Sequence, residues 1–306
     1  MKKICILASG GDAPGMNACV ESVFLSASRH GFETYGAIAG YHGLVKNEII
    51  RLAPANATNI SHLTGCVLKC GRSEEFTTPA GFDTALATIR GHGFVCVVVL
   101  GGNGSMRGAQ KLHASGIPVV FIPATIDNDV SFSKECLGFS SAAEESVRLV
   151  DNLNGTMQTN NRDHVVQVMG WDCPDLANFV GLATFADIVD TNAGRHSPNQ
   201  VAEVFNNNRK NGKTSNLMIM QEKRSTDIVA EAQDTVNYLG TLTRAVGIGR
   251  VRMTTLGHLQ RGAVPSARDR WLGNLYGEKA ASLIHGGKTG LCITLAGDKI
   301  TTVNIK

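Results

Sequence analysis

The sequence predicts an α/β protein made of two Rossmann-like lobes, each with a mostly parallel sheet, and a cleft between them. Apolar runs of strand length alternate with stretches of helix length along the chain, which is the pattern of βαβ units. The chain also has 306 residues, more than a single hydrophobic core usually accommodates. We therefore expect residues 1–138 and 252–306 to form one lobe and residues 139–251 to form the other.

Three buried strands are the clearest elements of the first lobe. Each is a short apolar run that ends in glycines or polar residues, as expected for a strand buried on both faces. These strands cover residues 3–8, 94–100 and 117–123. Amphipathic stretches that would cover the sheet as helices lie near residues 16–29, 81–91 and 104–114.

The alternation of strands and helices restarts near Gly138 and predicts the second lobe. The expected elements are a helix to about Gly155, a strand at 164–169, a helix near Leu176 and a strand at 216–221. The chain is then expected to return to the first lobe. That return would use a strand near 253–256, a helix after Ala267 and a strand at 290–295.

Composition excludes several classes of protein. The apolar fraction of 43% and the charged fraction of 18% are those of an ordinary globular protein. The net charge is +3, and the basic residues are scattered, so no stripe for nucleic acid is expected. No apolar run approaches the roughly twenty residues of a membrane span, and the short run after Lys3 breaks into glycines. We expect a cytoplasmic protein without a membrane or nucleic-acid partner.

The eight cysteines are interpreted as reduced thiols. The chain has no Cys-x-x-Cys pair, and several cysteines lie inside apolar runs. Cys66 and Cys70 are four residues apart, which would place both on one face of a helix as metal ligands. No histidine or second cysteine pair follows at zinc spacing, so a metal site there is not expected.

Two glycine loops are candidates for anion binding. The first predicted strand runs into SGGDAPGMN, and the second runs into GGNGS, from Gly101 to Ser105. Small residues let backbone N–H groups approach an anion, and the helix that follows favours negative charge at its N-terminus. A tight glycine turn without a ligand is the structural alternative. Neither loop is a Walker A motif, and neither gives a clean G-x-G-x-x-G, so a dehydrogenase is not expected.

The third strand runs into TIDND, which places two carboxylates two residues apart. Asp127 could accept a proton from a substrate hydroxyl, and Asp129 could lie near a metal, although Asp and Asn are also common in turns. The carboxyl ends of strands in an open α/β sheet form the ligand-binding edge. We therefore expect the three loops to share one crevice.

Taken in order, SGGDAPGMN, GGNGS, TIDND and LGHLQRG near residue 260 resemble the motifs of the bacterial ATP-dependent 6-phosphofructokinases. The resemblance spans nearly the whole chain. It implies transfer of the γ-phosphoryl group of ATP to the 1-hydroxyl of fructose 6-phosphate, a step of glycolysis that uses Mg²⁺. It also implies a nucleotide-binding first lobe, a sugar-phosphate-binding second lobe and a homotetramer whose sites are shared between subunits.

The resemblance also implies residue roles. Asp127 is implied as the general base, with Thr125 and Arg72 as further catalytic residues. The positions implied for ATP are Gly11, Arg72, Ser73, Gly102, Asn103, Gly104 and Ser105, and those implied for Mg²⁺ are Asn103 and Asp129. The positions implied for the sugar phosphate are Thr125, Ile126, Asp127, Arg162, Met169, Gly170, Trp171, Glu222, Arg252, His258 and Arg261. In the family's tetramers, Arg162 and Arg252 reach in from a neighbouring subunit.

The chain departs from the family pattern at several positions. The family's loop reads GGDGS, whereas this chain has Asn103, and Trp171 stands where an arginine usually follows Met-Gly. The effector pocket of allosteric relatives is lined by basic residues, but the matching positions here hold Glu21, Leu25, Pro54 and Asn154. Lys213 remains there, and Asp187 stands near a family acid. Regulation by ADP or phosphoenolpyruvate is therefore not expected.

Two alternatives to an ATP-dependent kinase remain open. One is a catalytically impaired paralogue that binds sugar phosphate or nucleotide, or serves as a regulatory subunit, as the changes at Asn103 and Trp171 would allow. The other is an enzyme that uses pyrophosphate as its donor. Pyrophosphate-dependent relatives usually have an acidic residue at the position of Gly104 and a lysine at that of Ala124, and this chain has neither.

Overall fold

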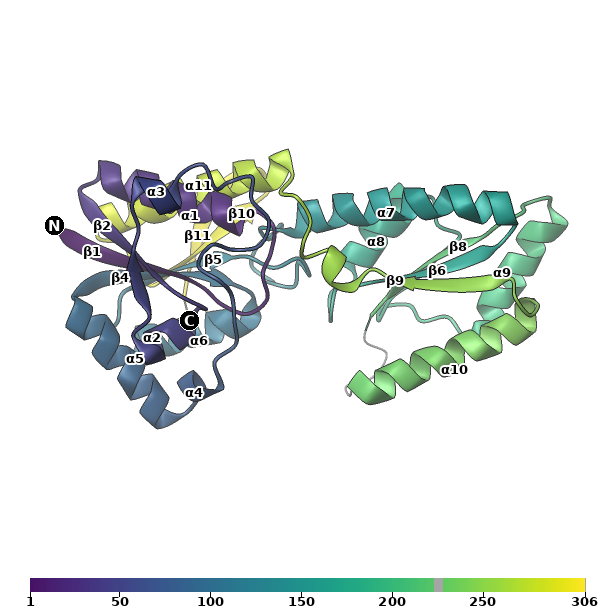
Figure 1. Cartoon of the computed structure of the whole chain (residues 1–306), viewed down its shortest axis with the longest axis horizontal. Coiled ribbons are helices and arrows are strands. Elements are labelled where there is room, and N and C mark those ends of the chain that lie inside the picture. The colour runs from purple at the N-terminus through teal and green to yellow at the C-terminus, as the bar shows by residue number, and fades with distance from the viewer. Residues whose placement is uncertain (223–227, 306) are drawn as a thin grey trace. The chain divides into compact units, whose positions relative to one another are not determined.

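The computed structural model describes residues 1–222 and 228–305. These residues form two compact units (Figure 1). Unit 1 contains residues 1–141 and 261–306, and unit 2 contains residues 142–260.

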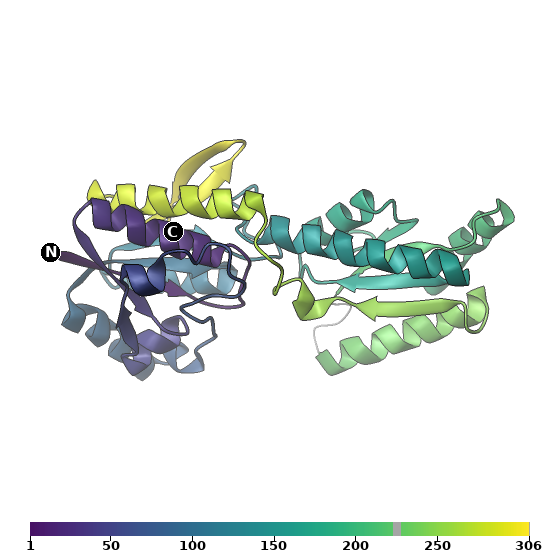
Figure 2. The same cartoon turned by 45° about the horizontal axis from the view of Figure 1, so that its top comes forward.

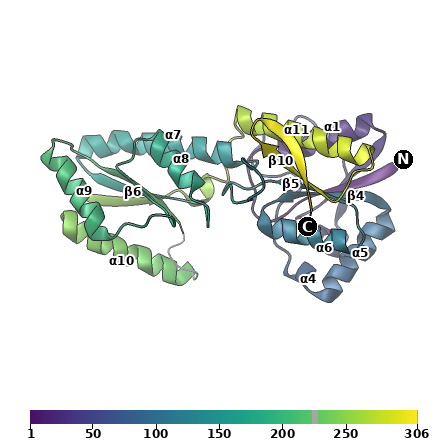
Figure 3. The same cartoon turned by 180° about the vertical axis from the view of Figure 1, so that it is seen from behind.

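Unit 1 is built on a seven-stranded sheet in the order β11-β10-β5-β4-β1-β2-β3. Its central strands run parallel, and the two edge strands, β3 and β11, run antiparallel to their neighbours. The strands are β1 (Lys2–Ala8), β2 (Phe32–Ala37), β3 (Ile49–Arg51), β4 (Phe94–Gly101), β5 (Val119–Pro123), β10 (Leu291–Ala296) and β11 (Lys299–Asn304). The C-terminal hairpin of β10 and β11 is drawn in yellow in Figure 3.

Helices cover both faces of the unit 1 sheet. One face carries α1 (Met16–Arg29) and α11 (Ala267–His285), which lie side by side (Figure 2). The helices of the other face include α2 (Tyr41–Lys46), α5 (Pro79–His92) and α6 (Asn103–Ala114), while α3 (Pro54–Ala57) and α4 (Glu74–Thr77) are single turns. The predicted first-lobe strands and helices are confirmed by β1, β4, β5, α1, α5 and α6.

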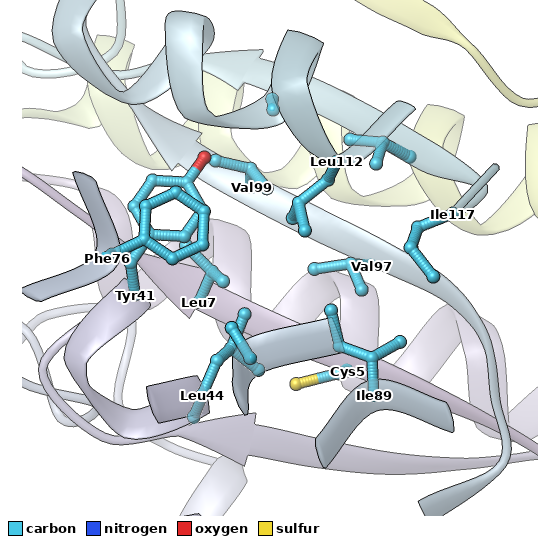
Figure 4. Close-up of a cluster of buried hydrophobic side chains, with 14 of the residues drawn as sticks. Cys5, Leu7, Tyr41, Leu44, Phe76, Ile89, Val97, Val99, Leu112 and Ile117 are labelled. Atoms are coloured by element: carbon cyan, nitrogen blue, oxygen red, sulfur yellow. The ribbon is translucent and has the colours of Figure 1, made fainter. Parts of the chain in front are cut away.

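The core between the sheet and the second helical layer is made of aliphatic and aromatic side chains (Figure 4). Val97 and Val99 of β4 pack in the same cluster as Leu112 of α6. The Tyr41 ring stacks on Phe76 with centroids 4.2 Å apart. Its hydroxyl donates a hydrogen bond of 2.6 Å to the backbone oxygen of Ser105, so a buried polar group is satisfied. This bond ties the core to the second glycine loop.

Unit 2 is built on a four-stranded parallel sheet in the order β7-β8-β6-β9. The strands are β6 (Asp163–Val168), β7 (Ile188–Asp190), β8 (Leu217–Gln221) and β9 (Val251–Thr255). The helices are α7 (Phe139–Asn160), α8 (Asp175–Ala183), α9 (Pro198–Lys210), α10 (Ile228–Val246) and the short η1 (Gly257–Leu259). Val165, Phe205, Met218 and Leu242 are among the residues of its core.

A buried carboxylate joins three elements of unit 2. Asp163, at the start of β6, is fully buried and accepts hydrogen bonds from the backbone and side-chain amides of Asn216, at 2.9 and 2.8 Å. It also forms an ion pair with Arg209 of α9. A buried charge is tolerated only when it is paired and hydrogen-bonded, and Asp163 meets both conditions.

One strand was predicted in the wrong sheet. The strand near 253–256 was expected to return to the first lobe, but β9 pairs with β6 in the sheet of unit 2, with Val165 opposite Met253. The strand at 290–295 does return, as β10 beside β5. Within the residues that the structure describes, no helix combines the length and apolar character needed to span a bilayer.

The packing of α1 against α11 gives a testable consequence. A Cβ added at Gly277 would lie 2.6 Å from the Cβ of Ser22 and 2.7 Å from the backbone nitrogen of Val23. Gly277→Ala should therefore destabilise the protein by about 1–3 kcal/mol, the usual cost of overpacking. Urea unfolding would measure this change.

The matched control is Gly91→Ala in the exposed end of α5, where no atom lies within 4 Å of the new methyl group. It should be neutral or stabilising by up to about 1 kcal/mol, because alanine favours the helix. Equal unfolding midpoints for the two variants would show that α1 and α11 are not closely packed at Gly277.

Candidate functional site

Three loops leave the same edge of the unit 1 sheet. The parallel register places Ala8 opposite Leu100 and Leu100 opposite Ile122, so β1, β4 and β5 end together. The loops that follow are residues 9–15, 101–105 and 124–129. This is the carboxyl edge, where ligands bind in open α/β sheets, and the loops gather there as predicted.

A hydrogen bond holds the first two loops against each other. The Ser105 hydroxyl donates to the Ser9 carbonyl oxygen at 2.9 Å. A Cβ at Gly101 would lie 2.6 Å from that same oxygen and would collide with the Ser105 side chain, so only glycine permits this approach. Ser105 was predicted to contact a nucleotide. The Ser105 hydroxyl already donates its proton to Ser9. The group of Ser105 that could still donate to a nucleotide is therefore its backbone N–H.

The second loop opens α6 with free backbone donors. The N-cap residue Gly102 has no side chain to accept from the first turn, and Met106 N–H is the donor that closes the turn onto Gly102. The N–H groups of Asn103, Gly104 and Ser105 therefore have no acceptor within the helix. Such a helix start binds anions, because its donors and the helix dipole both favour negative charge.

Asn103 connects the second loop to the third. Its side-chain amide donates to the backbone oxygen of Asp129 and to Oδ2 of Asp129, both at 3.0 Å. The other carboxylate oxygen, Oδ1, is buried and has no hydrogen-bond partner among the described residues. These are the two residues predicted to hold Mg²⁺, and the structure brings their side chains into contact.

Asp127 lies half-buried at the centre of the third loop. Its backbone N–H donates to Thr125 Oγ1 at 3.2 Å, which fixes the turn. Its Oδ2 lies 4.0 Å from Nη2 of Arg261. Arg261 also donates to the backbone oxygen of Asp12 at 3.2 Å, and a Cβ on Gly11 would collide with its guanidinium. Arg261 therefore spans the first and third loops and contributes positive charge beside Asp127.

A buried carboxylate anchors the chain that follows this loop. Asp269 of α11 accepts from the backbone N–H groups of Gly138 and Ser141, both at 2.7 Å, and from the Ser141 hydroxyl at 2.5 Å. Burial raises the pKa of Asp269 to about 6, and these hydrogen bonds oppose that rise. Asn128 adds a second anchor, because its Oδ1 accepts from the backbone of Cys136 at 2.8 Å.

The residue before Arg72, Gly71, connects this segment to the first loop. The Gly71 carbonyl accepts from the Gly10 N–H at 3.1 Å and from the Ser9 hydroxyl at 3.4 Å. Arg72 follows with an exposed side chain. Ser73 caps α4 by accepting from the Phe76 N–H at 3.2 Å. Its hydroxyl thus has a structural partner, and its predicted nucleotide contact stays a prediction.

In unit 2, part of the predicted sugar site gathers at the carboxyl ends of β6 and β8. The Glu222 carboxylate accepts from the Trp171 N–H at 3.3 Å. The Met169 N–H donates to the side chain of Gln260 at 2.9 Å, which brings the end of η1 to the same place. His258 lies within η1, and Gly170 adopts a left-handed φ of 132°.

The predicted arginines of unit 2 lie at the opposite end of β6. Arg162 precedes the strand, and Arg252 of β9 pairs with His164. From Arg162 to Met169 the chain advances seven residues in extended form, roughly 23 Å at strand spacing. The structure therefore divides the predicted sugar residues of unit 2 into two separate groups.

His164, which lies beside these two arginines, was not predicted as a site residue. It is 8% exposed, and its Nδ1 is buried without a partner among the described residues. Burial lowers the pKa of His164, and the nearby charges of Arg252 and Arg162 lower it further. A single histidine in a strand belongs to no sequence motif that would mark it as functional. His164 lies near Arg162 and Arg252 because it follows Arg162 closely in the chain and pairs with Arg252 on the neighbouring strand.

Two positions of the family's effector pocket have other partners here. The Glu21 carboxylate accepts from the backbone N–H groups of residues 59–61, at 2.7 to 3.1 Å. In unit 2, Asp187 pairs with Lys213 at 2.5 Å and accepts from Asn208 at 2.8 Å. Glu21 therefore holds the loop at residues 59–61, and the charge of Lys213 is neutralised by Asp187 of the same unit.

These features define an α/β protein with two glycine loops and a carboxylate loop gathered at the carboxyl ends of its parallel strands. The family model described as Phosphofructokinase matches residues 3–284. The chain is similar to the ATP-dependent 6-phosphofructokinases of Brevibacillus brevis, at 34% identity, and Clostridium novyi, at 35% identity. Each match covers all of this chain and 93% of the relative. The protein belongs to the phosphofructokinase family, as its motifs predicted.

Solved structures agree with the predicted fold class. The chain is similar to phosphofructokinase from Saccharomyces cerevisiae, with a TM-score of 0.86 and 28% sequence identity. The match covers 100% of this chain but only 45% of the yeast chain. The expected α/β architecture with mostly parallel sheets is confirmed.

The environment of His164 predicts a pH dependence of stability. Because its folded-state pKa lies below the ordinary value of 6.5, the unfolded chain takes up a proton there first as the pH falls. The stability that the neutral ring contributes is present above pH 6.5 and is lost below it. His164→Asn should lose less stability than the unchanged protein between pH 7.5 and 5.5, as measured by urea unfolding. Identical losses would contradict this assignment.

Proposed function

We propose that the protein transfers the γ-phosphoryl group of ATP to the 1-hydroxyl of fructose 6-phosphate and forms fructose 1,6-bisphosphate in glycolysis. The observation that carries this proposal is the contact of three loops at one sheet edge: Ser105 bonds to Ser9, Asn103 at the uncapped start of α6 bonds to Asp129, and Asp127 lies 4.0 Å from Arg261. Full-length similarity to proteins named ATP-dependent 6-phosphofructokinase supports the same activity.

The proposed ATP phosphates lie at the N-terminus of α6 and along the first loop. Backbone N–H groups from Asn103 to Ser105 would donate to them, and the exposed Arg72 would add positive charge. Gly104 is exposed, and the atom nearest to a Cβ built there is Nη2 of Arg107 at 3.8 Å. This open space suits a nucleotide. The acidic residue that marks pyrophosphate-dependent relatives at this position is absent, which argues against a pyrophosphate donor.

Asp127 would act as the general base. A carboxylate in this position can accept the proton of the sugar 1-hydroxyl as that oxygen attacks the γ-phosphorus. Phosphoryl transfer depends on in-line positioning and on stabilising the charge of the transferred group. Arg261 beside Asp127 and the amides of the glycine loops supply that charge.

Mg²⁺ fits the Asn103–Asp129 pair. The buried Oδ1 of Asp129 has no partner among the described residues, and hard cations bind through such oxygens. Asp129 would hold the ion, and the side-chain oxygen of Asn103 would be a neutral second ligand. When bound, Mg²⁺ would neutralise phosphate charge. Asn103 brings no charge of its own, so we expect weaker Mg²⁺ binding than a second carboxylate would give.

The sugar-phosphate site would be completed by another copy of the chain. Arg162 and Met169 lie at opposite ends of β6, too far apart for one fructose 6-phosphate to touch both. Met169, Glu222 and His258 would hold the sugar at one site, while Arg162 and Arg252 would grip the phosphate at a site of a neighbouring subunit. This division supports the proposed homotetramer. Buried cysteines such as Cys5, Cys96 and Cys292 are thiols, in keeping with the proposed cytoplasmic location.

A second candidate is a paralogue that binds the substrates without efficient turnover. It is favoured by Asn103, whose amide is engaged with Asp129, and by Trp171, which is 48% exposed where relatives have an arginine. A tryptophan cannot replace a guanidinium as a phosphate ligand. Calorimetric binding of fructose 6-phosphate without product formation would favour this candidate.

Asp127→Asn tests the kinase proposal. Removal of the base should lower kcat by about 10²–10⁴-fold, the usual contribution of general base catalysis, and should change both KM values little. Production of fructose 1,6-bisphosphate from ATP would be followed by a coupled assay. Asp83→Asn, at an exposed position of α5, is the matched control and should keep full activity. Unchanged protein that makes no more product than Asp127→Asn would refute the kinase proposal.

Asn103→Asp tests the magnesium ligands. The second carboxylate should lower the Mg²⁺ concentration at half-maximal activity, because like-charged oxygens on one cation bind it more tightly. Mn²⁺ binding followed by electron paramagnetic resonance gives a readout that does not depend on turnover. Asp129→Asn should have the opposite effect. If neither substitution changes the affinity for Mn²⁺, this pair does not hold the metal.

A further inference from the structure

Cys66 and Cys70 form a thiol pair beside the first glycine loop, and the proposed function uses neither residue. Both are partly exposed, whereas Cys5, Cys96 and Cys292 are buried in the sheet. The pair lies just before Gly71 and Arg72, in the segment that is hydrogen-bonded to Ser9 and Gly10.

A hydrogen-bonded turn connects the two cysteines. The Lys69 N–H donates to the Cys66 carbonyl at 2.9 Å, and Lys69 adopts a left-handed φ of 56°. Leu68, at the centre of the turn, is fully buried against Gly36 of β2. Asn17 holds the start of the segment by accepting from the Val67 N–H at 2.8 Å. The turn thus fixes the backbone that connects the two cysteines.

The Cys70 thiol donates to Sδ of Met16 at 3.6 Å. The neighbouring Cys70 thiol is the largest influence on Cys66 and lowers the pKa of the Cys66 thiol. Cys66 in turn raises the pKa of the Cys70 thiol. Burial instead raises the pKa of Cys5 to about 12 and that of Cys292 to about 11. The thiolate is the reactive form of cysteine, so Cys66 is the nucleophile of the pair and Cys70 is placed to resolve it.

We propose that Cys66 and Cys70 are a modification site that closes reversibly into a disulfide and so controls the nucleotide loop. The oxidant would be a small-molecule disulfide. The Cys66 thiolate attacks one of its sulfurs, forms a mixed disulfide and releases one thiolate. Cys70 then loses its proton and attacks Sγ of Cys66, which releases the second thiolate. Two protein thiols are oxidised as one disulfide is reduced to two thiols.

The effect on the loop follows from Gly71. Its carbonyl accepts from the Gly10 N–H and the Ser9 hydroxyl, which aligns the first loop. A disulfide at Cys70 would move the adjoining Gly71 and Arg72 and weaken both contacts. Oxidation should therefore weaken ATP binding. This consequence rests on the proposed function, whereas formation of the disulfide does not.

Peptide mapping of the full chain tests the disulfide itself. The protein would be treated with oxidised glutathione, blocked with N-ethylmaleimide and digested with trypsin without reduction. Cleavage after Lys69 separates the two cysteines into peptides 52–69 and 70–72. A species that contains both peptides and separates on reduction is the expected result. Recovery of the two peptides only as separate blocked or glutathionylated species would overturn the proposal.

Calorimetric titration with ATP tests the control of the loop. Oxidation should raise the Kd roughly tenfold, since small displacements of positioning groups have large effects, and dithiothreitol should reverse the change. Cys66→Ser and Cys70→Ser should bind ATP like the reduced protein and not respond to oxidation. Cys173→Ser, which removes a partly exposed cysteine of unit 2, should respond like the unchanged protein.

The two measurements separate the two hypotheses. A linked peptide without a change in Kd would refute control of the loop by the disulfide. Failure of the reduced protein to bind ATP would refute the proposed function, and the peptide map would still decide whether the thiol pair closes.

Discussion

The hydrogen bond from Ser105 to the Ser9 carbonyl is the constraint on which the candidate site depends. It joins the loops after β1 and β4 at the point where Gly101 leaves just enough room for them to meet. The Tyr41 hydroxyl fixes the backbone of Ser105 from the core side. The free donors of α6 are therefore positioned by the packing of the sheet before any ligand arrives, and such preorganisation lowers the cost of binding and of charge stabilisation.

Buried carboxylates hold each unit in a similar way. Asp163 joins β6, β8 and α9 in unit 2, and Asp269 joins α11 to the segment that follows the third loop in unit 1. In both cases the carboxylate accepts backbone N–H groups from chain segments that are distant in sequence. Burying these charges costs free energy, which the hydrogen bonds offset only in one geometry. The two buried carboxylates therefore determine how the segments around them are arranged, and they add little to the net stability.

The sequence was sufficient for the features that depend on local pattern. Apolar runs identified β1, β4 and β5, and their parallel order brought the candidate loops to one edge. It was insufficient for β9, because this short strand is only partly buried, and only long-range pairing with β6 decides its sheet. The hydrogen-bond partners of individual side chains could not be predicted from the sequence either. The direction of the Ser105 hydroxyl and the grouping of His164 with Arg252 depend on tertiary contacts that no spacing encodes.

The neutral side chain of Asn103 changes the charge and the hydrogen bonding at the proposed magnesium site. Two carboxylates at positions 103 and 129 would repel each other until a cation arrived, because like charges in close contact disfavour ionisation of both. The amide of Asn103 instead donates to Asp129, so the second and third loops are joined without any ion. The same bond occupies Oδ2 of Asp129 and leaves Oδ1 as the oxygen proposed to hold the cation. At the proposed site, Asn103 would therefore join the two loops without an ion and bring less negative charge to Mg²⁺ than a second carboxylate.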